Sequence, residues 1–264
     1  MRNLAKKLLD YFRFKPQIIT RHETHAILKG LPKCDFKYSV RMGSLEIAPH
    51  VDVEINTANA IRNSADKERM KECFKEGNVR TAKWFKSDRI EEVGISGLPY
   101  PIVIKHVKGS RGTGNYLINN TDELLDWLNK RKRVLKNYIF EEFLDYQKEY
   151  RLHVWEGGCF YSCRKMRREN TKSENMWQFK FSDCYWVKDT NPDFKKPKIW
   201  DEIEKECVKA LNSVGLSVGA CDVKVQGDDF FVIEINSAPS FGKVTGQKYM
   251  EILPKIAKTI YSKT

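Results

Sequence analysis

Apolar residues recur along this chain with two different spacings, and from about residue 64 onward they predict strands that alternate with helices. Apolar residues two positions apart indicate strands, whereas a spacing of three and four indicates helices. The stretch 166–198, rich in Lys, Arg, Asn and aromatic residues, is expected to be irregular. We expect strands at 36–40, 51–55, 79–85, 100–105, 115–118, 138–143, 149–155, 159–164, 221–224 and 231–236, and helices at 64–76, from 121, at 200–214 and at 247–261.

Capping residues support two of the helix starts. Ser64 precedes the first helix and Gly77 follows it, while Thr121 stands where an N-cap is needed for the second. Alternating strands and helices indicate lobes of the α/β or α+β class.

The last two predicted strands carry oxygen-bearing side chains. Asp222 lies on the first, and Glu234 and Asn236 lie on the second. Residues two apart in a strand share a face, so Glu234 and Asn236 point together, and Ile233 and Ile235 are expected to face the core. Carboxylate and amide oxygens suit a hard cation such as Mg²⁺, which commonly bridges substrate phosphates. The pattern therefore predicts a site for nucleotide chemistry.

Composition is that of a folded soluble chain. Its 264 residues are 41% hydrophobic and 31% charged, and no apolar run reaches membrane-spanning length. The basic N-terminal segment lacks the apolar core of a signal peptide, so we expect a cytoplasmic protein without a membrane partner. Seven cysteines without a C-x-x-C pair favour reduced thiols, and Cys159 and Cys163 are interpreted as core residues on one face of a strand.

The net charge of +12 permits binding to nucleic acid, to an acidic protein or to a nucleotide. It does not choose among them. The basic run at 130–133 is interpreted as a solvated end of a helix.

A glycine-rich segment between two predicted strands is a candidate phosphate loop. Glycine lets backbone N–H groups approach a phosphate closely, although a plain hairpin turn explains the loop equally well. It differs from a Walker loop, because Asn115 and Tyr116 follow where Lys and Ser or Thr are required. Lys105 ends the preceding strand and is expected to emerge beside the loop, whose residues are Gly109, Ser110, Arg111, Gly112, Thr113 and Gly114.

Two acidic positions follow that could bind a nucleoside. Backbone groups and a carboxylate of the connector at 141–144 would hold an adenine amine, and Glu149 would accept from ribose hydroxyls. A pair of solvated acids is the alternative. The connector residues are Glu141, Glu142, Phe143 and Leu144.

The order of these motifs resembles the ATP-grasp superfamily from about Asp66 to the C-terminus, in particular the ribosomal-protein glutamate ligase and glutathione synthetase type. The resemblance implies an α+β fold in which two lobes grip ATP, with a reduced N-terminal lobe. It implies an N-terminal lobe at 1–65, a small ATP-grasp lobe at 66–140 and a C-terminal lobe at 141–264.

The resemblance also implies a role for each matching residue. Lys67 and Lys105 match the phosphate lysines, and the loop at 109–114 matches the segment that closes over the triphosphate. Glu142 matches the acid near adenine, with the adjacent Glu141 as the alternative register, and Glu149 matches the ribose acid. Mg²⁺, with Mn²⁺ as an alternative, is expected on the family's metal ligands, Asp222, Glu234 and Asn236.

The implied activity is an ATP-dependent carboxylate–amine ligase that forms an amide bond through an acyl phosphate. An arginine should stabilise the tetrahedral intermediate; Arg164 is the first candidate, and Arg151 and Arg167 are its rivals. The carboxylate and the amine are unknown. An acidic protein or a nucleic acid is a macromolecular acceptor that the basic, aromatic stretch at 166–198 would suit.

Two other functions stay open. One is a nucleic-acid-binding or assembly protein that has lost its chemistry, and the other is a phosphotransferase that does not ligate. Ala220 stands where D-alanine ligases carry a catalytic arginine, which argues against that subgroup.

Overall fold

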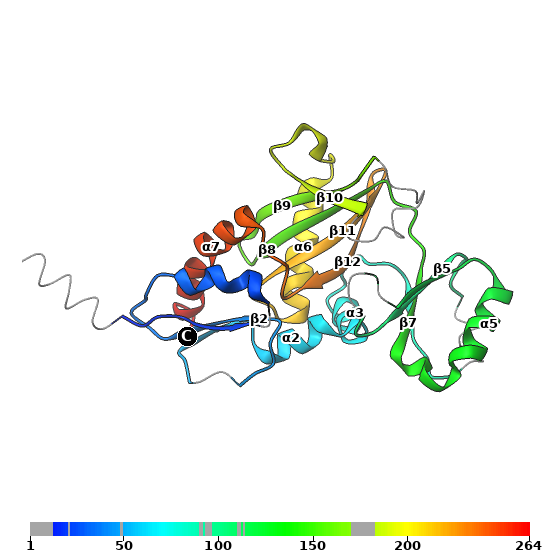
Figure 1. Cartoon of the computed structure of the whole chain (residues 1–264), viewed down its shortest axis with the longest axis horizontal. Helices are drawn as coiled ribbons and strands as arrows, with labels where there is room; N and C mark the ends of the chain where they lie inside the picture. Colours follow the sequence, from blue (N-terminus) through cyan, green and yellow to red (C-terminus); the bar gives the residue numbers. More distant parts are fainter. Residues whose placement is uncertain are drawn as a thin grey trace, which may run out of the picture.

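The computed structural model describes residues 13–20, 22–47, 50–89, 92, 97–109, 112, 114–169 and 183–264. The chain forms three sheets that follow one another along its long axis, with the largest sheet in the middle (Figure 1). Helices pack against each sheet, as expected for an α+β protein. None of the described helices is long and apolar enough to cross a membrane.

The N-terminal sheet is parallel and consists of β1 (Gln17–Thr20), β2 (Tyr38–Met42) and β3 (Val53–Ile55). Every residue of β2 is buried, because the 3-10 helix η1 (Glu23–Gly30) and α7 (Lys243–Tyr261) complete this core. The two strands expected here are confirmed, each beginning two residues later than predicted. The last helix begins four residues earlier than predicted.

The small sheet is antiparallel and has the strand order β4-β7-β5-β6. Only the last two residues of the strand predicted at 79–85 pair in this sheet. Trp127 and Leu128 on one helix close the core of this lobe. The elements are β4 (Trp84–Phe85), β5 (Ile102–His106), β6 (Asn115–Ile118), α5 (Thr121–Arg131), the 3-10 helix η2 (Lys132–Asn137) and β7 (Tyr138–Glu142).

The central sheet is antiparallel, with the order β10-β9-β8-β11-β12. One face packs on α6 (Trp200–Val214), whose apolar residues recur every three or four positions and whose bounds match the prediction. The short 3-10 helix η5 (Pro192–Phe194) precedes α6. The strands are β8 (Lys148–Trp155), β9 (Gly158–Arg167), β10 (Cys184–Lys188), β11 (Val218–Gln226) and β12 (Asp229–Asn236).

The expectation of an irregular stretch at 166–198 is wrong for part of its length. β9 extends to Arg167, and β10 forms the edge of the central sheet. A five-residue edge strand gives too short an apolar pattern to stand out among polar neighbours. Residues 170–182 of this stretch lie outside the described residues.

Both predicted helix starts need correction. The helix expected at 64–76 is two helices, α2 (Ala58–Ala65) and α3 (Lys67–Glu76), and the backbone between them is extended at Asp66. The Asp66 carboxylate caps α3 by accepting from the N–H groups of Glu68 and Arg69, so Ser64 is not the cap. At α5, the side chain of Asn120, rather than Thr121, accepts from a first-turn N–H group.

The interpretation of Cys159 and Cys163 as neighbours on one strand face is also wrong. A register shift in the β8–β9 pair places Cys159 opposite Val154 and Cys163 opposite Arg151. One extra residue reverses the alternation of faces, so Cys159 packs on the α6 side and Cys163 lies on the other. All seven cysteines are free thiols.

The N-terminal lobe supports the loop that follows β12. The buried His25 imidazole donates from Nε2 to the carbonyl oxygen of Pro239 at 2.9 Å, and Thr24 accepts from the Phe241 N–H at 3.3 Å. Gly43, with φ of 65°, lies so close to this loop that a Cβ atom would be 2.7 Å from the Cβ of Ala238.

We expect Gly43→Ala to lower the free energy of unfolding more than Gly227→Ala does. Both glycines have positive φ, which costs an L-residue roughly 1–2 kcal/mol, but no atom lies within 4 Å of a Cβ at Gly227. At Gly43 overpacking adds about 1–3 kcal/mol. Urea unfolding of both variants measures the difference. Equal losses of the free energy of unfolding would show that the loop at Ala238 moves aside without destabilising the fold.

Candidate active site

β11 and β12 bring three oxygen-bearing side chains together. Asp222 is paired with Glu234 across the two strands, and Asn236 Nδ2 lies 3.4 Å from Asp222 Oδ2 and 3.2 Å from Glu234 Oε1. A bulge at this point displaces Ile233, which is only half-buried, so its predicted core position is wrong. Ile235 is buried as predicted.

Arg151 on β8 forms a bidentate ion pair with Asp222 on the neighbouring strand. Its Nε and Nη2 donate to the two carboxylate oxygens at 2.6 and 2.7 Å, and its guanidinium lies 4.9 Å from the ring centre of Trp186. Burial raises the pKa of Asp222 to about 6, with Glu234 adding to the rise and Arg151 opposing it. Burial would also raise the pKa of Glu234, but Lys67, Asn236 and Arg151 lower it below the usual value.

Glu149 lies two residues before Arg151 on β8 and therefore on the same face of the central sheet. Its carboxylate accepts from Tyr146 Oη at 3.0 Å and pairs with Lys165 at 3.1 Å. Lys224 is paired with Glu149 in register and lies 4.0 Å over the ring of Tyr146. Burial lowers the pKa of Lys224 to about 8.

Helix α3 connects the candidate phosphate lysines. Lys67, in its first turn, donates to the carbonyl oxygen of Gly109 at the start of the glycine loop. Lys71, one turn later, is fully buried and pairs with Glu141, which also pairs with Lys105. Gly112 and Gly114 have positive φ, consistent with a turn. The other loop residues named above, Ser110, Arg111 and Thr113, lie outside the described residues.

The connector between the small and central sheets places its two acids differently. Glu141 turns inward and is 2% exposed, whereas Glu142, half-buried at the end of β7, accepts from the Lys83 N–H at 2.7 Å. The Phe143 N–H donates to Pro101, and Leu144 is half-buried. Glu142 therefore occupies the connector position, and Glu141 belongs to the lysine network.

The three candidate arginines lie on two different faces of the central sheet. Arg164 is paired with Tyr150 on the face that packs against α6, and it donates to the Asp193 carbonyl at 2.7 Å. Arg151 and Arg167 lie on the opposite face, with Asp222. The preference for Arg164 does not fit this geometry, because its side chain is on the wrong side of the sheet for the acids.

Sequence reasoning missed four residues of this network: Lys71, Tyr146, Lys165 and Lys224. Lys71 follows Lys67 at the spacing of one helical turn, which was the available signal. Lys165 and Lys224 required the strand register, which places both beside Glu149. The network holds six cations and four carboxylates, namely Lys67, Lys71, Lys105, Arg151, Lys165 and Lys224 with Glu141, Glu149, Asp222 and Glu234.

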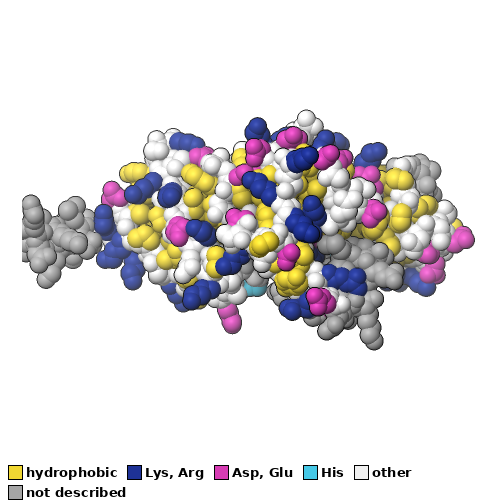
Figure 2. Space-filling model, turned by 90° about the horizontal axis from the view of Figure 1, so that it is seen from above, with side chains coloured by type: hydrophobic (Ala, Val, Ile, Leu, Met, Phe, Trp, Pro, Cys, Tyr) yellow, Lys and Arg dark blue, Asp and Glu magenta, His cyan; other side chains and the backbone are white. Residues whose placement is uncertain are grey.

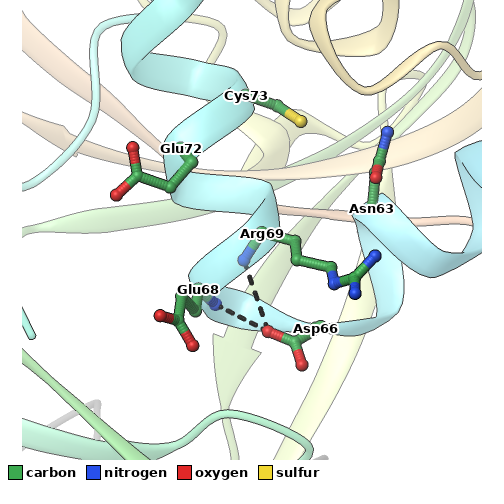
Figure 3. Close-up of a pocket in the computed structure, with 6 residues that line it drawn as sticks. All are labelled: Asn63, Asp66, Glu68, Arg69, Glu72 and Cys73. Atoms are coloured by element: carbon green, nitrogen blue, oxygen red, sulfur yellow. Dashed lines mark hydrogen bonds between the residues drawn. The ribbon is translucent and has the colours of Figure 1, made fainter. Parts of the chain in front are cut away.

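A separate hollow of about 450 Å³ lies beside α2 and α3 (Figure 3). Figure 3 shows Asp66 accepting from the backbone N–H groups of Glu68 and Arg69 at its edge. Asp66 caps α3, and none of the residues that line this hollow belongs to the charged network described above. The lining residues are Asn63, Asp66, Glu68, Arg69, Glu72 and Cys73.

The network fits a divalent cation and a polyphosphate on chemical grounds. Asp222, Glu234 and Asn236 supply hard oxygens, and burial raises the pKa of Asp222 while Arg151 opposes that rise. The six cationic side chains of the network outnumber its four carboxylates by two, which leaves positive charge to bind a polyanion. Lys105, on the small sheet, interacts electrostatically with Glu234 and Lys224 on the central sheet, so the two sheets contribute to one site.

The family of this chain is shown by its sequence. Residues 66–260 match the family described as the carbamoyl-phosphate synthase L chain, ATP binding domain. The chain belongs to the ATP-grasp superfamily. This confirms the resemblance and the ATP-grasp fold, and the matched region begins at Asp66, where the resemblance was placed.

Among curated proteins, the chain is similar to the formate-dependent phosphoribosylglycinamide formyltransferase of Prochlorococcus marinus, with 26% identity over 175 residues. The match covers 62% of this chain and 42% of the relative, so the chain spans less than half the length of that protein.

Two solved structures show the same fold. D-alanine–D-alanine ligase from Bacillus anthracis has a TM-score of 0.62 at 12% identity, covering 92% of this chain and 86% of that one. The ATP-grasp ligase PsnB, complexed with a phosphomimetic variant of its minimal precursor, Mg and ADP, has a TM-score of 0.55 at 16% identity, covering 78% and 62%. At these identities the likeness concerns the fold alone.

Proposed function

We propose that this ATP-grasp protein is an ADP-forming carboxylate–amine ligase that uses ATP and Mg²⁺. One observation carries the proposal. The candidate phosphate-binding lysines, Lys67 on α3 and Lys105 on β5, interact electrostatically with Glu234. Glu234 belongs to the cluster of oxygen donors on the central sheet, with Asp222 and Asn236. The match of residues 66–260 to a family described as an ATP binding domain supports the use of ATP.

Each residue has a proposed task. Lys67 and Lys105 bind the phosphates, and the connector at 142–144 and Glu149 bind adenine and ribose. Asp222, Glu234 and Asn236 would hold Mg²⁺, whose charge stabilises the transferring phosphoryl group. The lobes at 66–140 and 141–264 would grip the nucleotide, with 1–65 supporting the loop after β12.

The chemistry follows in two steps. A substrate carboxylate oxygen attacks the γ-phosphorus of ATP, the bond to the β,γ-bridging oxygen breaks, and ADP leaves. The amine then attacks the acyl carbon of the acyl phosphate, loses a proton, and expels phosphate. Arg151, which lies on the same sheet face as Asp222, would stabilise the negative charge of the tetrahedral intermediate.

On the face that Figure 2 shows, the charges of the described residues do not favour a binding-only function. Figure 2 shows Lys and Arg over the face seen from above with Asp and Glu between them, rather than one continuous basic patch. In the basic run at 130–133, Lys130 pairs with Asp126 and Arg131 lies 4.5 Å from the ring centre of Tyr116. These charges already have partners within their own lobe.

Phosphate release from ATP, screened over pools of carboxylates and amines, tests the proposal. We expect release only when both substrates are present, with ADP as the nucleotide product and transfer of carboxylate ¹⁸O into phosphate. A phosphorylated product without amide formation would instead identify a phosphotransferase. Absence of ATP binding would contradict both functions.

A further inference from the structure

Lys71 is a fully buried lysine that touches no expected substrate. Its Nζ lies 3.0 Å from Glu141 Oε1 and donates to Thr81 Oγ1 at 2.6 Å. Burial lowers the pKa of Lys71, and Glu141 opposes that change. Burying an ammonium group costs free energy unless a partner compensates, so the burial of Lys71 depends on its ion pair with Glu141.

The partner of Lys71 is shared with Lys105. Glu141 presents one carboxylate oxygen to each lysine, which links α3 to β7 and β5 of the small sheet. Burial would raise the pKa of Glu141, yet the two ammonium groups lower it to about 2. The two ion pairs therefore join two lysines to a single carboxylate.

We propose that Lys71 is a positioning residue that acts through Glu141 to keep the charge of Lys105 available to a nucleotide phosphate. With Lys105 alone, Glu141 would form a neutral pair and attract Lys105 away from an anion. With Lys71 present, the carboxylate is already compensated, and one net positive charge remains for a phosphate at Lys105. The inference rests on the proposed ATP site at Lys105.

The net charge of Lys71, Lys105 and Glu141 suggests an experiment in which a second substitution restores the affinity that a first one removes. Lys71→Met leaves the cluster neutral, and we expect its dissociation constant for a non-hydrolysable ATP analogue with Mg²⁺ to rise about tenfold. Lys71→Met combined with Glu141→Gln restores one net positive charge, so affinity should return to within about threefold of wild type. A purely structural role predicts no such rescue.

Matched variants make the result specific. Lys75→Met removes an exposed lysine from the same helix and should leave affinity unchanged. In a background that carries both Lys105→Met and Glu141→Gln, Lys71→Met should have no further effect, because neither the carboxylate that Lys71 compensates nor the Lys105 charge is present. Lys71→Gln, which keeps a hydrogen-bond donor for Thr81, replaces the Met variant if thermal unfolding shows that the latter does not fold.

Calorimetric titration separates the two hypotheses. Wild-type protein that fails to bind the analogue would overturn the proposed function. Wild-type protein that binds, together with a Lys71→Met or Lys71→Gln variant of equal affinity, would overturn only the role of Lys71. Weak binding that persists in the double variant would also overturn it.

Discussion

Glu234→Gln and Asp222→Asn are expected to reduce ATP turnover about 10³-fold or more. Coordinated Mg²⁺ is worth several kcal/mol of transition-state stabilisation, and each 1.4 kcal/mol is a factor of ten in rate. Each variant removes one charged ligand while keeping the size of the side chain. Steady-state phosphate release over a range of Mg²⁺ concentrations is the measurement.

The choice of substitution matters at Asp222. Asp222→Ala would leave the Arg151 guanidinium buried without its bidentate partner, and breaking such a pair costs roughly 3–5 kcal/mol of stability. Asn keeps an oxygen that accepts from Arg151. Asp229→Asn, an exposed change on β12, the strand that carries Glu234, is the control and should retain full turnover. Retained turnover in both Glu234→Gln and Asp222→Asn would overturn the metal-site assignment.

Arg151→Lys is expected to lower kcat about 10²-fold, whereas Arg164→Lys should change it less than threefold. Lysine keeps the charge of Arg151 but cannot reproduce the fork that holds both Asp222 oxygens or the stacking on Trp186. Arg164 lies on the sheet face covered by α6, so its replacement leaves the face that carries Asp222 unchanged.

A Mg²⁺ titration decides how Arg151 acts. If excess Mg²⁺ restores kcat in Arg151→Lys, the arginine only positions Asp222. If kcat stays low at saturating Mg²⁺, it stabilises the reacting groups directly. A larger loss in Arg164→Lys than in Arg151→Lys would reverse the assignment made from the sheet faces.

Local patterns predicted the fold well wherever the spacing was regular. The bounds of α6 followed from its apolar spacing, and the shared face of Glu234 and Asn236 followed from period-two alternation, while the resemblance placed Asp222 with them as a metal ligand. The same alternation failed at Ile233 and at the Cys159–Cys163 pair. In both places an extra residue reverses the faces, and such a bulge has no reliable signal in a single sequence.

The sequence alone determined the superfamily, the order of the site motifs and the kind of cation that the oxygen donors suit. These depend on residue type and on spacing within one element, which the chain carries locally. Only the tertiary structure decided which arginine faces the acids, that Glu141 turns inward while Glu142 stays in the connector, and that Lys71 joins Lys105 through Glu141. These facts depend on pairing between strands and helices far apart in the chain, because a side chain's partner is set by register and burial.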